Sequence, residues 1–172
     1  NPILVEFDIR DDSSSATEVE RLYTEMANSG MYHALIGPYS SGLSLVAARV
    51  ANQSGQLIMM HQAGSPSVYS QGFQRVFSVN VMAPDYTADT LRLLYERGAR
   101  TVALAQGSSL FHHAICDGAR YHATQLGYQV VSEVSIADAD ITSGIKSCAL
   151  SSPDVFVGCG HLHNAVQVTV TS

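Results

Sequence analysis

The stretch YHALIGPYSSGLSLVAARV, residues 32–50, decides the fold. It begins as a short β-rich apolar run, turns through glycine, proline and two serines, and continues with apolar residues at helical spacing. A strand followed directly by a helix is half of a parallel crossover unit. The turn between them, GPYSSG at residues 37–42, places two adjacent hydroxyl groups at the start of the helix.

Ser40 and Ser41 in this turn have two possible roles. Backbone N–H groups at a helix start have no partner within the helix, and the helix dipole is positive there, so together with two hydroxyls they can hold a carboxylate. The alternative is that one serine only caps its own helix. The turn is not a phosphate loop, because it lacks a lysine, and it is not a hydrolase elbow, because the Gly-x-Ser-x-Gly spacing is absent.

The same alternation of strands and helices continues along the chain. Ser15 and Glu18 form a capping box at a helix start, and Gly30, Gly55 and Gly127 mark helix ends. We expect strands at residues 3–9, 32–37, 56–62, 73–81, 101–106, 128–136 and 154–160, with helices between them. The continuous apolar type of the 56–62 strand predicts burial on both faces. The fold class is therefore α/β, with parallel sheets flanked by helices, and the irregular stretch 78–86 is a crossing between two sheets.

Composition excludes several function classes. The chain has 172 residues, 46% apolar and 14% charged, with a net charge of −6. Its one lysine, Lys146, and its scattered arginines form no basic patch, so we expect no nucleic-acid partner. No apolar run approaches the roughly 18 residues of a membrane span.

Small polar and aromatic residues gather where the expected strands end. Ligands of open parallel sheets bind beyond the carboxyl ends of the strands, and those ends are residues 37–42, 61–67, 105–113 and 158–164. Ser65 should lie beside Ser40 and Ser41, and Gly64 lets a ligand approach the main chain closely. The alternative is an ordinary turn before Pro66. Phe111 either covers a ligand or packs in the core. The pattern indicates a cleft for a small polar ligand.

Cysteines and histidines give weaker signals. The chain has three cysteines, Cys116, Cys148 and Cys159, and an odd number does not form a disulfide framework, so we expect buried free thiols. One bridge is possible, with Cys148 joined to Cys116 or Cys159. In an extended segment Cys159, His161 and His163 would share one face, a set that suits zinc. A polar loop is the favoured alternative, so we expect no metal and no cofactor.

No spacing ties a nucleophile to a base and an orienting group, so we expect no enzyme. The competing hypothesis is a flavodoxin-like or metal-dependent enzyme that uses the same cleft.

Three segments together resemble one known family. Residues 5–67 run from a strand into an Asp-Asp loop and a helix, then into GPYSSG and a second strand ending in HQAGSPS. This order is similar to the amino-terminal lobe of type I periplasmic binding proteins, which include leucine/isoleucine/valine-binding proteins and receptor ligand-binding regions. Residues 72–131 resemble the crossing into the second lobe, and residues 138–160 resemble the next unit of that lobe.

The resemblance implies a two-lobed flytrap domain that captures a small polar ligand by hinge closure. The ligand is expected to be an amino acid or a related carboxylate. Residues 1–80 would form the amino-terminal lobe without its first strand and helix, and residues 81–172 would form a partial second lobe. By the same resemblance Ser40 and Ser41 hold the ligand's carboxylate, Ala63, Gly64 and Ser65 bind the head group, and Phe111 contributes from the facing lobe.

Partners follow from the same resemblance. A transporter component would present its ligand to a membrane permease, whereas a receptor would signal through a transmembrane segment. Either implies a periplasmic or extracellular location and a possible homodimer, and the sequon at residues 52–54 slightly favours a receptor. Two features depart from the family. The tail, residues 164–172, alternates like a strand, and no acidic residue to pair with a ligand's amine is identifiable, because Glu133 and Asp138 are poorly placed.

Overall fold

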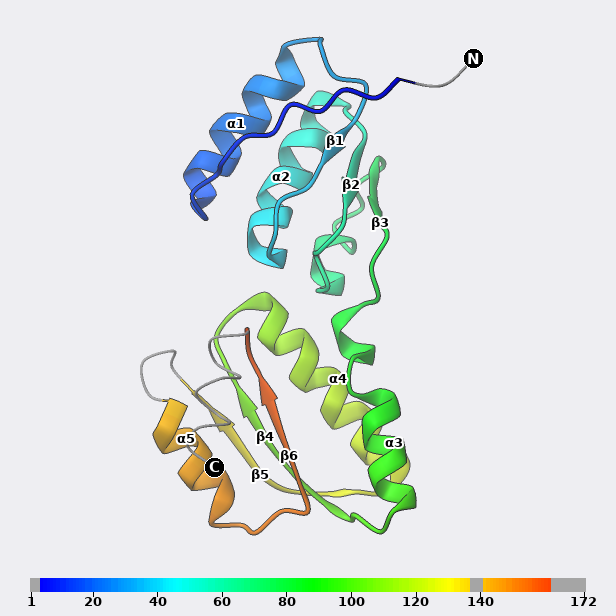
Figure 1. Ribbon diagram of the computed structural model, residues 1–172, viewed down its shortest axis with the longest axis vertical. Coiled ribbons are helices and arrows are strands. Elements are labelled where there is room, and N and C mark those ends of the chain that lie inside the picture. The colour runs from blue at the N-terminus through cyan, green and yellow to red at the C-terminus, as the bar shows by residue number, and fades with distance from the viewer. Residues whose placement is uncertain (1–3, 137–140, 162–172) are drawn as a thin grey trace.

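The computed structural model describes residues 4–136 and 141–161, which form two α/β bodies arranged along the long axis of the molecule (Figure 1). The first body contains a parallel sheet in the order β1-β2-β3, and the second contains a parallel sheet in the order β5-β4-β6. The α/β fold class with parallel sheets flanked by helices is therefore confirmed.

The amino-terminal body packs two helices on one face of its sheet (Figure 1). Apolar residues at helical spacing give α1 and α2 one buried face each. These faces pack against the strand side chains that point toward the helices. The elements of this body are α1 (Ala16–Asn28), β1 (Leu35–Ile36), α2 (Ser41–Ser54), β2 (Ile58–Met60), the 3₁₀ turn η1 (Pro66–Val68) and β3 (Val76–Ser78).

The carboxyl-terminal body covers both faces of its sheet. Helices α3 and α4 pack on one face and α5 on the other (Figure 1). Its elements are the 3₁₀ turn η2 (Ala83–Asp85), α3 (Ala88–Glu96), β4 (Thr101–Gln106), α4 (Leu110–Leu126), β5 (Gln129–Ser135), α5 (Ile141–Ala149) and β6 (Val155–Cys159).

Local signals placed the helix ends correctly. Ser15 caps α1, and its hydroxyl accepts a hydrogen bond from the Glu18 N–H at 3.4 Å, as the capping box predicts. Gly55 and Gly127 end α2 and α4 in the left-handed conformation that glycine adopts without strain, with φ of 71° and 93°. The expected crossing is also confirmed, because residues 79–82 leave β3 and η2 then packs against α4, where a Cβ on Gly118 would collide with Pro84.

The predicted strand at residues 3–9 is wrong for its described residues, because 4–10 form no strand. A strand needs a neighbour for its backbone groups, and within the described chain β1 pairs only with β2. The segment is held instead by Arg10, which bonds to Asp8, Glu25 and Tyr32. Its apolar side chains stay exposed: Leu4, Val5, Phe7 and Ile9.

The predicted burial of the 56–62 strand on both faces is also wrong. In β2, Ile58 and Met60 are fully buried against the helices, whereas Met59 between them is 42% exposed. Ile36 and Phe77 are its partners in register on the neighbouring strands, and both are about half exposed. Since α1 and α2 cover only one face, this apolar row lies uncovered among the residues that the structure places.

Cysteine chemistry differs from the expectation of free thiols. Cys116 on α4 forms a disulfide with Cys159 at the end of β6, with Cα atoms 5.7 Å apart. Cys148 is the free, buried thiol, so neither pairing of Cys148 occurs. The reason is the layering, because α4 and α5 lie on opposite faces of the sheet (Figure 1). Burial raises the pKa of the Cys148 thiol.

Removing the disulfide should destabilise the protein. The bond links residues 43 apart in sequence, and closing such a loop in the unfolded chain stabilises the native state by about 2–4 kcal/mol. The Cys116→Ala/Cys159→Ala variant should lose this amount in denaturant unfolding. A reductant should lower the melting temperature of the wild type and leave that of the double variant unchanged. Equal melting of the wild type with and without reductant would contradict the assignment.

Asp154 ties the start of β4 to the loop before β6. Its carboxylate accepts hydrogen bonds from the backbone N–H groups of Arg100 and Thr101, at 2.8 and 2.9 Å, and from the Thr101 hydroxyl at 2.9 Å. The bond from the Arg100 backbone is the largest cause that lowers the pKa of Asp154 below its usual value of 3.8. A carboxyl with a lowered folded-state pKa stabilises above its unfolded pKa and loses this contribution as pH falls.

An Asp154→Asn variant should therefore melt below the wild type at neutral pH, with the difference shrinking as pH falls below 3.8. Thermal unfolding of both proteins between pH 7 and 2 measures this difference. A difference that stays constant across that range would exclude a role for the carboxylate's charge.

Candidate functional site

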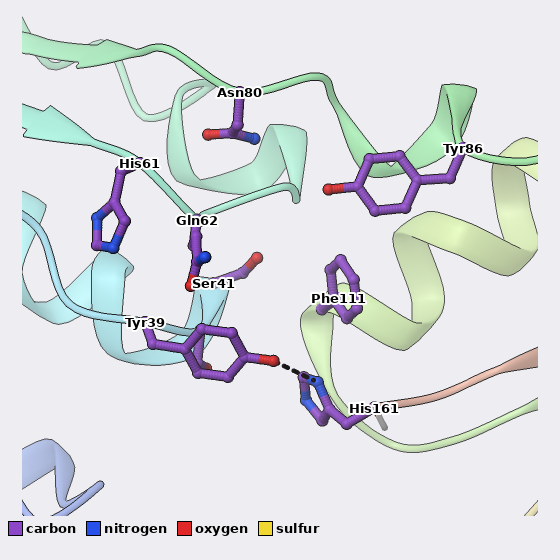
Figure 2. Close-up of a pocket in the computed structure, with 9 residues that line it drawn as sticks. Tyr39, Ser41, His61, Gln62, Asn80, Tyr86, Phe111 and His161 are labelled. Atoms are coloured by element: carbon purple, nitrogen blue, oxygen red, sulfur yellow. Dashed lines mark hydrogen bonds between the residues drawn. The ribbon is translucent and has the colours of Figure 1, made fainter. Parts of the chain in front are cut away.

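A cavity of about 210 Å³ lies between the two bodies (Figure 2). It is smaller than the roughly 300–1,000 Å³ of typical small-molecule sites, so it suits a ligand of few atoms. Each of its lining residues follows the carboxyl end of a strand, belongs to the crossing or begins a helix. They are Tyr39, Ser40, Ser41, His61, Gln62, Asn80, Tyr86, Phe111 and His161.

Ser40 and Ser41 lie where α2 begins. Ser40 has φ 81° and ψ 133° and makes no capping hydrogen bond with its side chain. This backbone region is nearly restricted to glycine, and strained residues of this kind cluster at ligand sites. The alternative in which Ser40 merely caps its own helix is not what the structure shows. Ser41 is almost fully buried, and its hydroxyl oxygen accepts a hydrogen bond from the Ser65 N–H at 3.0 Å.

The turn Ala63, Gly64 and Ser65 lies behind the cavity wall and does not line the cavity. A Cβ on Gly64 would lie 3.2 Å from the Tyr86 hydroxyl oxygen and 3.3 Å from Cε2 of Phe111. The missing side chain at position 64 therefore lets two lining rings approach the main chain. In the structure this turn positions lining residues, and its direct contact with a ligand stays a prediction.

Four rings line the cavity, three from the carboxyl-terminal body and Tyr39 from the amino-terminal body (Figure 2). Phe111, in the first turn of α4, stacks on His161 with centroids 5.3 Å apart and planes 11° apart. Tyr86 meets Phe111 edge to face at 6.0 Å, and Tyr39 lies 6.0 Å from His161. Phe111 is thus part of the cavity wall, and its ring is held on both sides by other rings.

A hydrogen bond between Tyr39 and His161 joins the two bodies at the cavity. The Tyr39 hydroxyl lies 3.3 Å from Nδ1 of His161, and Figure 2 shows the two side chains pointing toward each other. His161 follows Cys159 by two residues, so the disulfide fixes the end of the strand that carries this ring. The Cys159 carbonyl also accepts a hydrogen bond from the Gly107 N–H at 3.3 Å.

The zinc alternative loses its ligands. Cys159 is consumed by the disulfide, His161 stacks in the cavity wall, and His163 lies outside the described residues. Among the residues that the structure describes, no group of three or more His, Cys, Asp or Glu side chains is arranged to hold a metal ion.

No Asp, Glu, Lys or Arg side chain lines the described cavity wall. Glu133 pairs with Arg120, whose Nε lies 3.0 Å from the carboxylate, and this contact is the largest cause that raises the pKa of Arg120. Asp138 lies outside the described residues. The wall described here carries hydroxyl, amide, imidazole and phenyl groups only.

Sequence reasoning found part of this wall. Ser40, Ser41 and Phe111 were expected, and the structure brings them together; ligand binding by them stays a prediction. Tyr39 lies inside the quoted turn GPYSSG, and His61 and Gln62 open the quoted HQAGSPS. Asn80 and Tyr86 belong to the irregular crossing. The only feature of the sequence that points to them is the break in the alternation of strands and helices there. For His161 the sequence indicates only a role as a metal ligand beside Cys159 and His163.

Comparisons with known proteins agree with this architecture. The model of a family described as periplasmic binding protein matches residues 4–169. A periplasmic binding protein from Burkholderia mallei superimposes with a TM-score of 0.84 at 16% identity, covering 94% of this chain and 44% of that one. No described helix is long and apolar enough to cross a membrane.

Two solved structures with ligands in their titles are also similar. A substrate-binding protein of an ABC transporter from Desulfitobacterium hafniense, in complex with Leu, has a TM-score of 0.77 at 16% identity, covering 94% of this chain and 51% of that one. A solute-binding protein from R. palustris, in complex with benzoate, has a TM-score of 0.78 at 18% identity, with coverages of 94% and 48%. The chain thus spans about half the length of the structures that it matches.

Ser41→Ala should destabilise the protein more than Ser40→Ala. Losing the Ser41 hydroxyl leaves the buried Ser65 N–H without its acceptor, which costs about 1–3 kcal/mol. Ser40 is the matched control, because its side chain makes no capping bond and its replacement should change stability by less than about 0.5 kcal/mol. Denaturant unfolding measures both; equal effects would show that the Ser41–Ser65 bond is not structural.

Proposed function

The chain belongs to the periplasmic binding protein family, and from this premise we propose that it reversibly captures a small carboxylate, an amino acid or a related acid, without catalysis. The observation that carries the proposal is the cavity between the two bodies. Its walls come from the start of α2 in one body and the start of α4 in the other, so a ligand there contacts both.

The two lobes that close on the ligand are residues 1–80 and 81–172. The crossing supports this boundary, because residues 79–82 connect β3 to η2, and η2 already packs on α4. Hinges are a few residues at element ends that absorb changes in backbone angles. Residues 79–82 have this position, since they are the described connection between the sheets.

Closure needs ligand contacts that differ between the open and closed states. A ligand beside Ser40 and Ser41 that also touches Phe111 stabilises the closed arrangement, because only closure brings both walls to it. The bond between Tyr39 and His161 joins the same two lobes and adds to the closed state. The lobes then open when the ligand leaves.

Ligands named for similar structures support a carboxylate. One similar protein is in complex with Leu, one with benzoate and one with 3,4-dihydroxybenzoic acid. The chemical group common to the three is a carboxylate. The start of α2, with its positive dipole end and two hydroxyls, matches this group in charge and in donors.

Partners and location follow the family. Similar proteins are described as substrate-binding proteins of ABC transporters, so we propose a membrane permease as the partner and a periplasmic or extracellular location. A receptor with a transmembrane segment is the second possibility. A homodimer stays a prediction. The enzyme alternative is not favoured, because the family is one of binding proteins.

Thermal unfolding against a panel of amino acids and simple carboxylates tests the proposal. A ligand at 100 times its dissociation constant should stabilise the protein by roughly 2.7 kcal/mol. The shift should be lost in Ser40→Ala/Ser41→Ala and, should that variant fold poorly, weakened in Ser40→Ala alone. Ser54→Ala, at the opposite end of α2, is the matched control. Absence of any shift in the wild type would contradict capture of a carboxylate.

A further inference from the structure

We propose that the ligand of this cavity is an aromatic carboxylate without an ammonium group, an inference that rests on the proposed function and narrows it. The two halves of this statement have separate grounds. The rings of the cavity wall favour a flat aromatic body, and the charges around the cavity favour an anion over a zwitterion.

The ring wall is organised for stacking. Phe111 and His161 lie nearly parallel, and Tyr86 meets the edge of Phe111 at an interplanar angle of 71°. Aromatic pairs of these two geometries gain energy beyond the area that they bury. Tyr39 adds a fourth ring from the other lobe, so a flat ligand here meets rings from both sides of the closure (Figure 2).

Packing behind the wall keeps the rings in place. Gly64 lies so close to the Tyr86 hydroxyl and the Phe111 ring that the two rings rest against the main chain. The disulfide at Cys159 fixes the strand end that carries His161. Because these rings are already held in place, they lose little conformational entropy when a ligand binds. This favours a ligand that stacks on them over a flexible aliphatic ligand.

Charge around the cavity disfavours an ammonium group. The 14-residue α2 and the α4 helix both begin at the cavity, and helix starts carry partial positive charge. No Asp or Glu side chain lines the described wall. Glu133, one of the two acidic candidates that the sequence offered, is paired with Arg120. An α-ammonium would therefore lose its hydration without gaining an opposite charge, which is costly.

Polar groups on the ring wall and facing it suit an aromatic ligand with oxygen substituents. Figure 2 shows the Tyr86 hydroxyl pointing toward Asn80 and Gln62 across the cavity, with His61 beyond them. Hydroxyl, amide and imidazole groups both donate and accept hydrogen bonds, so they match hydroxyl groups on a ligand. The carboxylate then lies at Ser40 and Ser41.

Two matched ligand pairs test the inference by isothermal titration of the chain. 3-Phenylpropanoate and phenylalanine differ only by the α-ammonium, and the zwitterion should bind about tenfold more weakly or worse. Benzoate and cyclohexanecarboxylate have similar sizes and the same charge, and benzoate should bind roughly 2- to 10-fold more tightly. Leucine completes the panel as an aliphatic zwitterion.

Phe111→Leu keeps an apolar side chain and removes the ring. In this variant the ratio of the dissociation constants of cyclohexanecarboxylate and benzoate should fall toward one. Tyr121→Leu is the control, because Tyr121 lies on the same helix, is 61% exposed and does not line the cavity. It should leave both affinities unchanged.

The outcomes separate this inference from the proposed function. Tighter binding of phenylalanine or leucine than of the aromatic acids would overturn the inference and leave carboxylate capture in place. Equal binding of benzoate and cyclohexanecarboxylate, or a preference that Phe111→Leu does not alter, would overturn the aromatic half. Binding of none of the five compounds would overturn both.

Discussion

Parallel strand pairing is the constraint on which the site depends. In a parallel sheet every strand ends at the same edge, so the loops that follow the strands are neighbours in space. The ends of β1, β2 and β3 deliver Tyr39, His61 and Asn80 to one wall. The ends of β4 and β6 deliver Phe111 and His161 to the other. The cavity exists because two such edges face each other across the crossing (Figure 1).

Bonds that hold the fold are also the bonds that position the site. The Ser41 hydroxyl oxygen accepts a hydrogen bond from the Ser65 N–H, and this bond fixes the start of α2 against the turn that follows β2. Gly64 in that turn supports two rings of the wall, and the disulfide at Cys159 holds the strand end that carries His161. Such support from buried packing and hydrogen bonds is what keeps a binding site preorganised.

The described cavity wall is rich in hydrogen-bonding groups, as the proposed capture of a small anion requires. No Asp or Glu side chain lines the described wall, and Cys159, which the zinc alternative required, is bonded to Cys116. The start of α2 with its two serines lies on one side of the cavity, and the Phe111 and His161 rings lie on the other. The proposed ligand, a small anion with a flat apolar body, matches both sides.

The sequence by itself determined the alternation of strands and helices, the starts and ends of α1, α2 and α4, and the turn that begins α2. These features depend on local periodicity and on single residues such as Ser15, Gly55 and Gly127, whose effect is confined to a few neighbours. Only the tertiary structure decided the Cys116–Cys159 pairing and the gathering of four rings. It also decided the exposure of residues 4–9, because a strand requires a neighbour that no local pattern supplies. These outcomes depend on which distant segments meet, and packing between the two sheets decides that.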